Sequence, residues 1–305
     1  MDLCMIGYEK SESNLKLLEE AKGKFDKVFF VPIDGIGIGL TDSFGITYRA
    51  TDLLKFGAVF PRIPRKFCSY GYQLLSLFPQ ETYMPIKPIS FLLADERFFL
   101  LTVLRKRNIP TLNLQLANSP IAGTRLTSAI KFPFIIRTPE KKTGVIVNGE
   151  SEAKNIIGAL SSLKKSVLLE ELVKDMISVY VAEPEVIGAV RKRTKEMDVV
   201  FGEGEIKKQK ITSEIEHMAL DAARAIEAQV VRIDMTLAPE PKIVNVDLNP
   251  NLTKPSKVTG INLPEKIMGS IQENYKAHLE KPMLIKFFDD AKSVVKDVLK
   301  TKQMM

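Results

Sequence analysis

The fold is decided by two segments toward the C-terminal end of the chain: Val230-Val231-Arg232-Ile233-Asp234 and Ile243-Val244-Asn245-Val246-Asp247-Leu248-Asn249-Pro250-Asn251. Both are apolar and rich in β-branched residues, and a proline-containing turn separates them, which is typical of a β-hairpin. Side chains alternate along a strand, so Asp247 and Asn249 face one way and Leu248 faces the other. These segments therefore predict an antiparallel hairpin with polar side chains gathered at one end.

The polar end of this hairpin has two interpretations. If the strands pair, Asp234 joins Asp247 and Asn249, and two carboxylates with an amide oxygen make a hard oxygen site that suits Mg²⁺. The alternative is that these residues form Asx turns at a strand end, just before Pro250. The residues by themselves favour neither interpretation, so both stay open at this point.

Further short apolar runs and helical patterns precede and follow this hairpin. Two more hairpins are expected, 132–138 with 143–149 and 178–182 with 186–191, each across a turn that contains Pro or Gly. Other strands are expected over residues 3–7, 27–32, 57–63, 111–117 and 166–172, and helices over residues 12–22, 70–77, 95–107, 150–163, 212–228, 264–279 and 287–301. This order predicts an open α/β layer up to about residue 90, followed by an antiparallel α+β region.

The composition is that of a globular protein. Of the 305 residues, 45% are hydrophobic and 27% are charged, close to the averages for folded domains, so wholesale disorder is excluded. The two cysteines, Cys4 and Cys68, exclude a disulfide framework and a cysteine-based zinc site. The longest apolar stretch, Pro88 to Leu104, is interrupted by three charged residues, and the N-terminus has no basic signal region. We therefore expect a cytoplasmic protein with no membrane partner.

Three other features carry a weaker functional signal. The balance of 44 basic against 37 acidic residues, a net charge of +7, mildly favours an anionic ligand. The basic residues between Arg191 and Lys210 have little aromatic interleaving, so we expect a solvated face there rather than a nucleic-acid site. The run Gly35-Ile36-Gly37-Ile38-Gly39 lacks the spacing of a phosphate loop, and we expect a plain flexible loop.

Several segments, taken in order, resemble the motifs of one known superfamily. They are Gly57-Ala58-Val59-Phe60-Pro61-Arg62-Ile63 with Ser69-Tyr70-Gly71, Ala94-Asp95-Glu96-Arg97 through Asn108-Ile109-Pro110-Thr111, Lys131-Phe132-Pro133-Phe134-Ile135-Ile136-Arg137, Val167-Leu168-Leu169-Glu170-Glu171-Leu172-Val173, the two hairpin segments, and Val258-Thr259-Gly260-Ile261-Asn262-Leu263-Pro264. Through their order and spacing, the chain resembles the ATP-grasp ligases from about residue 3 to residue 275. The most similar groups are the RimK family of ribosomal-protein glutamate ligases, the LysX lysine-biosynthesis proteins and the archaeal coenzyme glutamate ligases.

The resemblance implies an α/β N-terminal layer followed by an α+β ATP-grasp unit of antiparallel sheets and packing helices, with ATP clamped between two α+β subdomains. The implied domains are an N-terminal α/β domain over residues 1–90, a linking helix and small lid subdomain over 91–165, a C-terminal core with the metal hairpin over 166–282, and an amphipathic C-terminal helix over 283–305.

The same resemblance implies an ATP-dependent carboxylate–amine ligase that forms an amide through an acyl-phosphate. Such an enzyme would add glutamate or a similar amino acid to an acidic acceptor, either a small molecule or a peptide. The implied cofactors are ATP and Mg²⁺, with Mn²⁺ as an alternative metal. The oligomeric state is left open, with a homo-oligomer as one alternative.

Site residues follow from the resemblance position by position. ATP is assigned to Arg97, Arg137, Lys141, Lys142, Glu170, Glu171, Leu172 and Val173, the metal to Asp234, Asp247 and Asn249, and the substrate to Arg62, Arg65 and Tyr70. The two substrate arginines could hold a carboxylate bidentately, although a basic turn after a buried strand is an equal alternative.

The chain also departs from the family pattern. Arginine stands at both phosphate-lysine positions, which keeps the charge but changes its shape and reach. Asp247 replaces the usual glutamate, and the Gly-rich loop is reduced to residues 139–144. An arginine expected near the reacting phosphate is missing, and Arg191 is the hypothesised catalytic substitute. These departures favour a second hypothesis, a degenerate ATP-grasp protein that binds a nucleotide or a partner with little or no catalysis.

Overall fold

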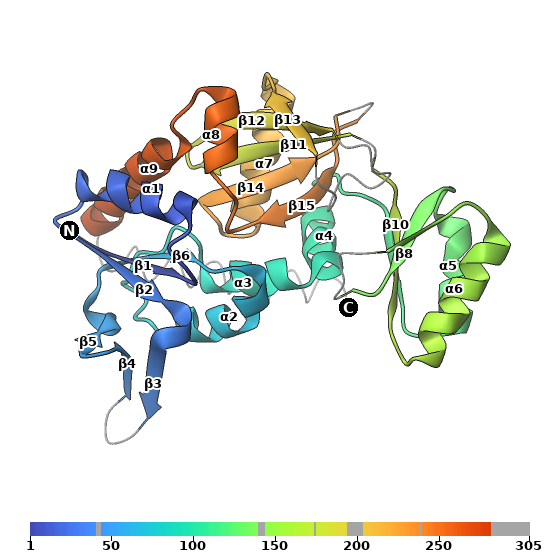
Figure 1. Cartoon of the computed structure of the whole chain (residues 1–305), viewed down its shortest axis with the longest axis horizontal. Coiled ribbons are helices and arrows are strands. Elements are labelled where there is room, and N and C mark those ends of the chain that lie inside the picture. The colour runs from blue at the N-terminus through green and yellow to red at the C-terminus, as the bar shows by residue number, and fades with distance from the viewer. Residues whose placement is uncertain (41–43, 140–143, 174, 194–203, 238–239, 282–305) are drawn as a thin grey trace.

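The computed structural model describes residues 1–305 except 41–43, 140–143, 174, 194–203, 238–239 and 282–305 (Figure 1). Two sequence predictions therefore lie outside the described residues: the amphipathic helix over 287–301, and the ATP assignment of Lys141 and Lys142. Within the described residues, helices pack on four sheets, and the core is one large cluster of apolar side chains with a second, smaller cluster under the four-stranded sheet.

The N-terminal residues form a parallel sheet, as the β-α-β pattern predicts. Strands β2 (Lys27–Pro32), β1 (Asp2–Gly7) and β6 (Ala58–Arg62) pair in the order β2-β1-β6. Helix α1 (Glu12–Lys22) joins β1 to β2, and its first turn is capped by Ser11, whose hydroxyl accepts a hydrogen bond from the Asn14 backbone N–H. Helix α2 (Cys68–Ser76) follows β6. The α/β layer that we expected up to about residue 90 is confirmed.

The glycine run is part of a strand, so the prediction of a plain loop is wrong. Strand β3 (Ile36–Leu40) pairs antiparallel with β4 (Phe44–Tyr48), which pairs with the short β5 (Thr51–Asp52). Apolar residues alternate with glycine along β3, and this period of two suits a strand once a partner supplies the cross-strand hydrogen bonds. The hairpin projects from the N-terminal layer at the lower left of Figure 1.

The helix expected over 95–107 is confirmed, slightly shortened, and a second helix that was not expected precedes it. Helices α3 (Pro88–Asp95) and α4 (Arg97–Lys106) meet at Glu96, whose extended backbone (φ −107°, ψ 96°) separates them. Pro88 stands in the first turn of α3, where its missing N–H costs no hydrogen bond. The break matters for the site because it places Arg97 at the first position of α4.

The four-stranded sheet has the order β7-β10-β8-β9, formed by β7 (Leu114–Ala117), β10 (Val167–Glu171), β8 (Phe134–Arg137) and β9 (Val145–Val147). Helices α5 (Pro120–Leu126) and α6 (Glu150–Ser162) cover one face and bury the smaller apolar cluster against it (Figure 1). The antiparallel pairing of β8 with β9 confirms the hairpin expected over 132–149.

The five-stranded antiparallel sheet has the order β13-β12-β11-β14-β15. Its strands are β13 (Glu205–Lys208), β12 (Glu185–Arg193), β11 (Met176–Ala182), β14 (Val230–Met235) and β15 (Ile243–Asp247). Helix α7 (Ser213–Ala225) packs on β11, β12 and β14. The other two predicted hairpins, β11 with β12 and β14 with β15, are both present.

Two helices after β15 return the chain to the N-terminal layer. Helix α8 (Thr253–Thr259) ends at Gly260, which has a left-handed backbone (φ 71°) and donates its N–H to the Ser256 carbonyl. Helix α9 (Leu263–Glu280) then packs against α1 (Figure 1).

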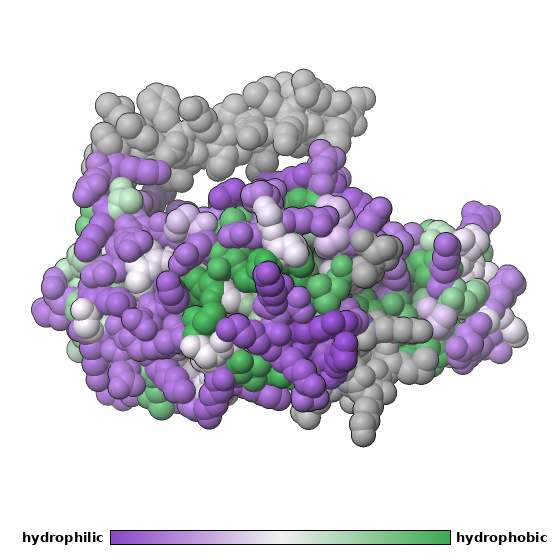
Figure 2. All heavy atoms as spheres, turned by 90° about the horizontal axis from the view of Figure 1, so that it is seen from above, coloured by the Kyte–Doolittle hydropathy of each residue, from purple (hydrophilic) through white to green (hydrophobic). Residues whose placement is uncertain are grey.

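Among the described helices, none is both long enough and apolar enough to cross a bilayer. On the face drawn in Figure 2, hydrophilic side chains predominate and hydrophobic ones form patches between them.

Candidate functional site

A buried cluster of three charged side chains connects the four-stranded and five-stranded sheets. Glu170 on β10 is fully buried, and its carboxylate forms ion pairs with Arg97 of α4 and with Arg137 of β8, whose Nε lies 3.3 Å from Oε2. Arg97 also donates two hydrogen bonds to the Val244 carbonyl of β15, from Nε at 3.1 Å and from Nη2 at 2.7 Å. Buried charges are tolerated when they are paired and hydrogen-bonded. Among the described residues, this cluster therefore places two arginine side chains on one carboxylate.

The residues that follow Glu170 form a second link between the same two sheets. Glu171 is half-exposed, and its carboxylate oxygens lie 3.2 Å and 3.3 Å from Lys242 Nζ, just before β15. The carboxylate also accepts a hydrogen bond of 3.2 Å from the Asn113 backbone N–H. Leu172 is half-buried and Val173 is buried. The four residues assigned to the adenine hinge therefore lie where the chain passes from one sheet to the other.

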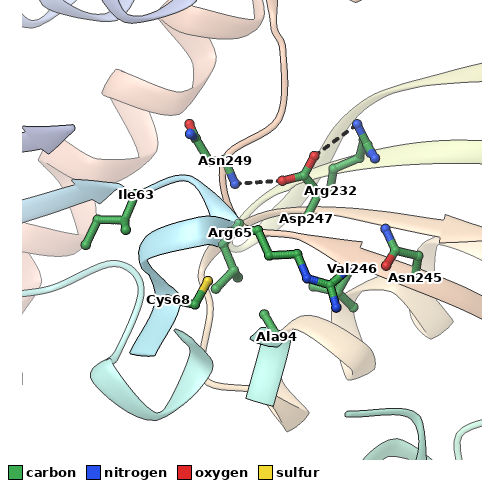
Figure 3. A pocket seen from close by; sticks show the side chains of 10 residues that line it. Ile63, Arg65, Cys68, Ala94, Arg232, Asn245, Val246, Asp247 and Asn249 are labelled. Atoms are coloured by element: carbon green, nitrogen blue, oxygen red, sulfur yellow. Dashed lines mark hydrogen bonds and ion pairs between the residues drawn. The ribbon is translucent and has the colours of Figure 1, made fainter. Parts of the chain in front are cut away.

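The C-terminal hairpin has a register that places Asp247 opposite Arg232, and Asp234 opposite Asn245. The two carboxylates are thus diagonal neighbours on one face of the sheet rather than direct partners. Asn249 lies beyond the end of β15, and its backbone N–H donates to Asp247 Oδ1 at 2.9 Å. Figure 3 shows the Asn249 side-chain amide pointing away from the Asp247 carboxylate. The hairpin therefore brings the two carboxylates together but not the amide.

Arg232 contacts both carboxylates, and Figure 3 shows its contact with Asp247. Its Nε and Nη2 bind the two oxygens of Asp234, each at 2.9 Å, and its Nη1 lies 3.2 Å from Asp247 Oδ2. Burial opposes the charged form, but Asp234 and Asp247 outweigh it and raise the pKa of the Arg232 guanidinium above its ordinary value. The position assigned to a metal is therefore filled by a cation of the chain itself.

The geometry does not fit a divalent metal as the hairpin is folded. Asp234 is fully buried, and besides Arg232 it accepts hydrogen bonds from Ser178 Oγ at 2.6 Å and Asn245 Nδ2 at 3.1 Å. Within the described part of the chain, no three His, Cys, Asp or Glu side chains are grouped so as to hold a metal ion. The metal assignment of Asp234, Asp247 and Asn249 stays a prediction, and it requires the Arg232 contacts to break.

A pocket of about 200 Å³ opens beside this end of the hairpin. Its lining includes Arg65, Cys68, Arg232, Asp247 and Asn249, as drawn in Figure 3. Burial raises the pKa of the Cys68 thiol to about 12, so this cysteine is not a thiolate at neutral pH. The pocket therefore offers arginine and carboxylate groups, a surface suited to a ligand that carries both charges.

The three residues assigned to the substrate lie in different surroundings. Arg65 donates a hydrogen bond of 2.8 Å to the Asp95 carbonyl at the pocket wall. Arg62 is instead buried, where its Nε donates to Asn14 Oδ1 at 3.1 Å and its Nη2 donates to the Pro250 carbonyl at 2.8 Å. Burial lowers the pKa of Arg62 to about 10, although Asp247 acts in the opposite direction. Tyr70 is half-buried and packs against the main core.

Arg191, the hypothesised catalytic residue, lies on β12 in a pair with Asp175. Its Nε lies 2.9 Å from Asp175 Oδ1, and its Nη2 binds the other carboxylate oxygen. The hydrogen bond to Arg191 lowers the pKa of Asp175, and the same bond raises that of Arg191. The structure thus places Arg191 in a bidentate ion pair, whereas the pocket described above is lined by Arg232.

The sequence analysis did not identify two residues of the site, Arg232 and Lys242. Arg232 stands where the resembled hairpin motif has glycine (G-V-D against Arg232-Ile233-Asp234), and this substitution was the available signal. Lys242 carried no such signal, because its partner Glu171 comes from a distant part of the chain.

Comparisons with known proteins agree with this architecture. A model of the RimK-like ATP-grasp domain matches residues 94–271. A probable alpha-L-glutamate ligase of Thioalkalivibrio sulfidiphilus is 24% identical over 246 residues, 76% of this chain and 82% of that protein. A ribosomal protein bS6–L-glutamate ligase of Escherichia coli is 25% identical over 242 residues, 75% of this chain and 81% of that protein. The solved structure of the ATP-grasp ligase PsnB, complexed with a phosphomimetic variant of a minimal precursor, Mg and ADP, superposes with a TM-score of 0.69 at 15% identity, covering 90% of this chain and 98% of that one.

Proposed function

Because the chain belongs to the RimK-like ATP-grasp family of carboxylate–amine ligases, we propose that it uses ATP to join glutamate or a similar amino acid to a carboxylate on a small molecule or peptide. The observation that carries this proposal is the position of Arg97 and Arg137. Both lie in the buried cluster that connects the two sheets, beside the strand that carries the hinge residues. Arginine side chains at that place suit the phosphates of a nucleotide, which they can bind through bidentate hydrogen bonds.

The proposed reaction has two steps. A carboxylate oxygen of the acceptor attacks the γ-phosphorus of ATP, the bond to the β-phosphate oxygen breaks, and ADP leaves. The amine of the incoming amino acid then attacks the acyl carbon of the acyl-phosphate, forms the amide, loses a proton to solvent and expels inorganic phosphate. Positive groups are needed along the triphosphate because charge develops on the transferring phosphoryl group. We assign this role to Arg97 and Arg137.

The remaining residues have supporting roles in the proposal. The backbone of Glu170 to Val173 contacts adenine, and Arg65 at the pocket wall holds a carboxylate of the acceptor or of the amino acid. The relatives named as glutamate ligases support glutamate as the amino acid, and the PsnB precursor complex supports a peptide acceptor.

ATP and Mg²⁺ are the proposed cofactors, because the PsnB structure contains Mg and ADP. The described residues do not form an open metal site, so the steps above use only the groups of the chain itself. We expect Mg²⁺ to enter bound to the nucleotide.

A second candidate function is nucleotide or partner binding without turnover. The observation that favours it is Asp234, whose carboxylate is fully engaged by Arg232, Ser178 and Asn245. In that case nucleotide binds but no ADP forms with any substrate pair.

One experiment separates the two candidates. The purified protein is titrated with ATP and with a non-hydrolysable analogue by calorimetry, and ADP release is then followed with glutamate and acidic acceptors. Ligase function predicts micromolar binding, and ADP release only when amino acid and acceptor are both present. Arg137→Ala should weaken binding, whereas Lys154→Ala, an exposed residue of α6 paired with Glu150, should not. Binding without ADP release on any pair supports the second candidate. No binding of either nucleotide contradicts the ligase function and, for the second candidate, leaves only binding of a partner.

A further inference from the structure

The cation between Asp234 and Asp247 is the guanidinium group of Arg232. Arg232 is the strand partner of Asp247 and lies two residues before Asp234, so all three side chains are on the same face of the hairpin. Each nitrogen of the guanidinium meets a carboxylate oxygen: Nε and Nη2 meet Asp234 at 2.9 Å, and Nη1 meets Asp247 at 3.2 Å. A planar guanidinium is well suited to such bidentate contact, and its charge is permanent.

Asp234 has no free acceptor position for a second cation. A carboxylate offers about four lone-pair sites, and here Oδ1 accepts from Arg232 and Ser178 while Oδ2 accepts from Arg232 and Asn245. Its side chain is fully buried. A metal could reach it only by displacing Arg232 or one of the two neutral donors.

The other two residues of the expected metal site are Asp247 and Asn249. The Asp247 carboxylate already has partners, and the Asn249 amide points away from it. Asp247 uses one oxygen for Arg232 and the other for the Asn249 backbone N–H. The Asn249 amide points away from it (Figure 3). Two carboxylates brought this close need a positive partner, and the guanidinium already supplies it.

Arg232 also faces the pocket, as a bound metal would have to. Its side chain is 22% exposed, and it lines the cavity together with Arg65 and Asp247. An anionic group that enters this pocket therefore meets the guanidinium directly.

We propose that Arg232 takes the place of a protein-bound divalent metal between Asp234 and Asp247, so that the hairpin binds no metal of its own and nucleotide binding does not require one. The statement about the metal rests on the hairpin geometry alone. The statement about the nucleotide rests in addition on the proposed function.

The first test measures metal binding without nucleotide. Mn²⁺ is titrated into the protein, and free Mn²⁺ is followed by electron paramagnetic resonance. Wild-type protein and Arg232→Lys should show no Mn²⁺ site that depends on Asp247. Arg232→Gly should gain one site, and Arg232→Gly combined with Asp247→Asn should lose it again. A wild-type site that disappears in Asp247→Asn would overturn the proposal.

Removing Arg232 leaves two neighbouring carboxylates without their cation, so Arg232→Gly is expected to be less stable. Mg²⁺ should then raise the melting temperature of Arg232→Gly and leave that of the wild type unchanged. If the variant does not fold even with Mg²⁺, the wild-type and Asp247→Asn titrations still decide the question, because they need no destabilised protein.

The second test measures nucleotide affinity in EDTA and in Mg²⁺. For the wild type, the affinities for a non-hydrolysable ATP analogue should agree within about threefold, whereas for Arg232→Gly they should differ by tenfold or more. Wild-type binding that is lost in EDTA would overturn the nucleotide statement. Absence of binding in both media would instead overturn the proposed function, and the Mn²⁺ titration would still decide the role of Arg232.

Discussion

Arg97 and Glu170 form an ion pair in which both side chains are almost completely removed from solvent, with 4% and 0% of their surface exposed. They come from helix α4 and strand β10, and Arg137 of β8 contacts the same carboxylate. Through its hydrogen bonds to the Val244 carbonyl, Arg97 also reaches the five-stranded sheet. In our interpretation this pair joins the two sheets, and its arginine is one of the two that we propose to contact the phosphates of the nucleotide.

The first prediction concerns stability. Glu170→Ala leaves two buried guanidinium groups without their carboxylate, and removing one partner of a buried pair typically costs about 3–5 kcal/mol. The matched control is Glu171→Ala on the same strand, whose pair with Lys242 is about a third exposed, so its loss should cost about 1 kcal/mol or less. Urea unfolding of both variants checks this. Equal losses would show that the buried pair contributes no more than the exposed one.

The second prediction concerns the competition between Glu170 and phosphate for the two arginines. Glu170→Gln keeps the shape of the side chain but removes the negative charge, so residue 170 no longer competes with an anionic ligand for the two arginines. We expect the dissociation constant for ATP to fall by roughly tenfold, which corresponds to about 1.4 kcal/mol, while the protein becomes less stable. Calorimetric titration measures the change. Weaker ATP binding in a folded Glu170→Gln protein would mean that Glu170 itself contacts the nucleotide.

The third prediction concerns Arg62 and Arg65, which the sequence analysis both assigned to the substrate and which the structure places in different surroundings. Arg62→Ala leaves the buried Pro250 carbonyl and the Asn14 side chain without their donor, at about 1–3 kcal/mol for each unsatisfied group. Arg65→Ala removes a single hydrogen bond at the pocket wall and should cost about 1 kcal/mol or less. Its effect should appear instead in the ligation assay, as a higher KM for the carboxylate substrate. A destabilised Arg65→Ala protein with unchanged KM would reverse this assignment.

The fourth prediction concerns how the free energy of unfolding changes as the pH falls into the acid range. Arg191 lowers the pKa of Asp175 below its ordinary value of 3.8 in the folded protein, so the unfolded chain takes up this proton first as the pH falls. The stabilisation is therefore present above that ordinary value and is lost as the pH falls through the lower, folded value. Because the pair is about a third exposed, it should contribute about 1 kcal/mol or less at neutral pH.

Thermal unfolding of wild type and Asp175→Asn across this pH range tests the sign. The difference in stability should be constant at neutral pH and disappear at the acid end. A difference that grows as the pH falls would contradict the lowered pKa. The Arg191→Ala variant provides the other half of the test, because it should lose the same acid-dependent contribution.

Much of the fold follows from local pattern. The three hairpins, the parallel N-terminal layer and helix α1 could be predicted because alternating apolar residues, turn residues and a serine cap are properties of neighbouring residues. The β3–β4 hairpin was missed because glycine has little preference for strands, and only the partner strand supplies its hydrogen bonds. Helix α3 was missed, whereas the helix expected over 95–107 is present as α4, and the extended backbone of Glu96 separates the two.

The site divides in the same way. The sequence by itself determined which residue types are present: two arginines at the lysine positions of the family, the carboxylates of Asp234 and Asp247, and a glutamate that begins the hinge. Only the tertiary structure decided which of them meet. In the folded chain, Arg97 of α4 pairs with Glu170 of β10. Arg62 is buried and donates hydrogen bonds to Asn14 and Pro250, and Arg232 contacts both hairpin carboxylates. The physical reason is that an ionic contact depends on strand register and on partners far away in the chain, and a charged side chain in a low-dielectric interior must find such a partner wherever the fold supplies it.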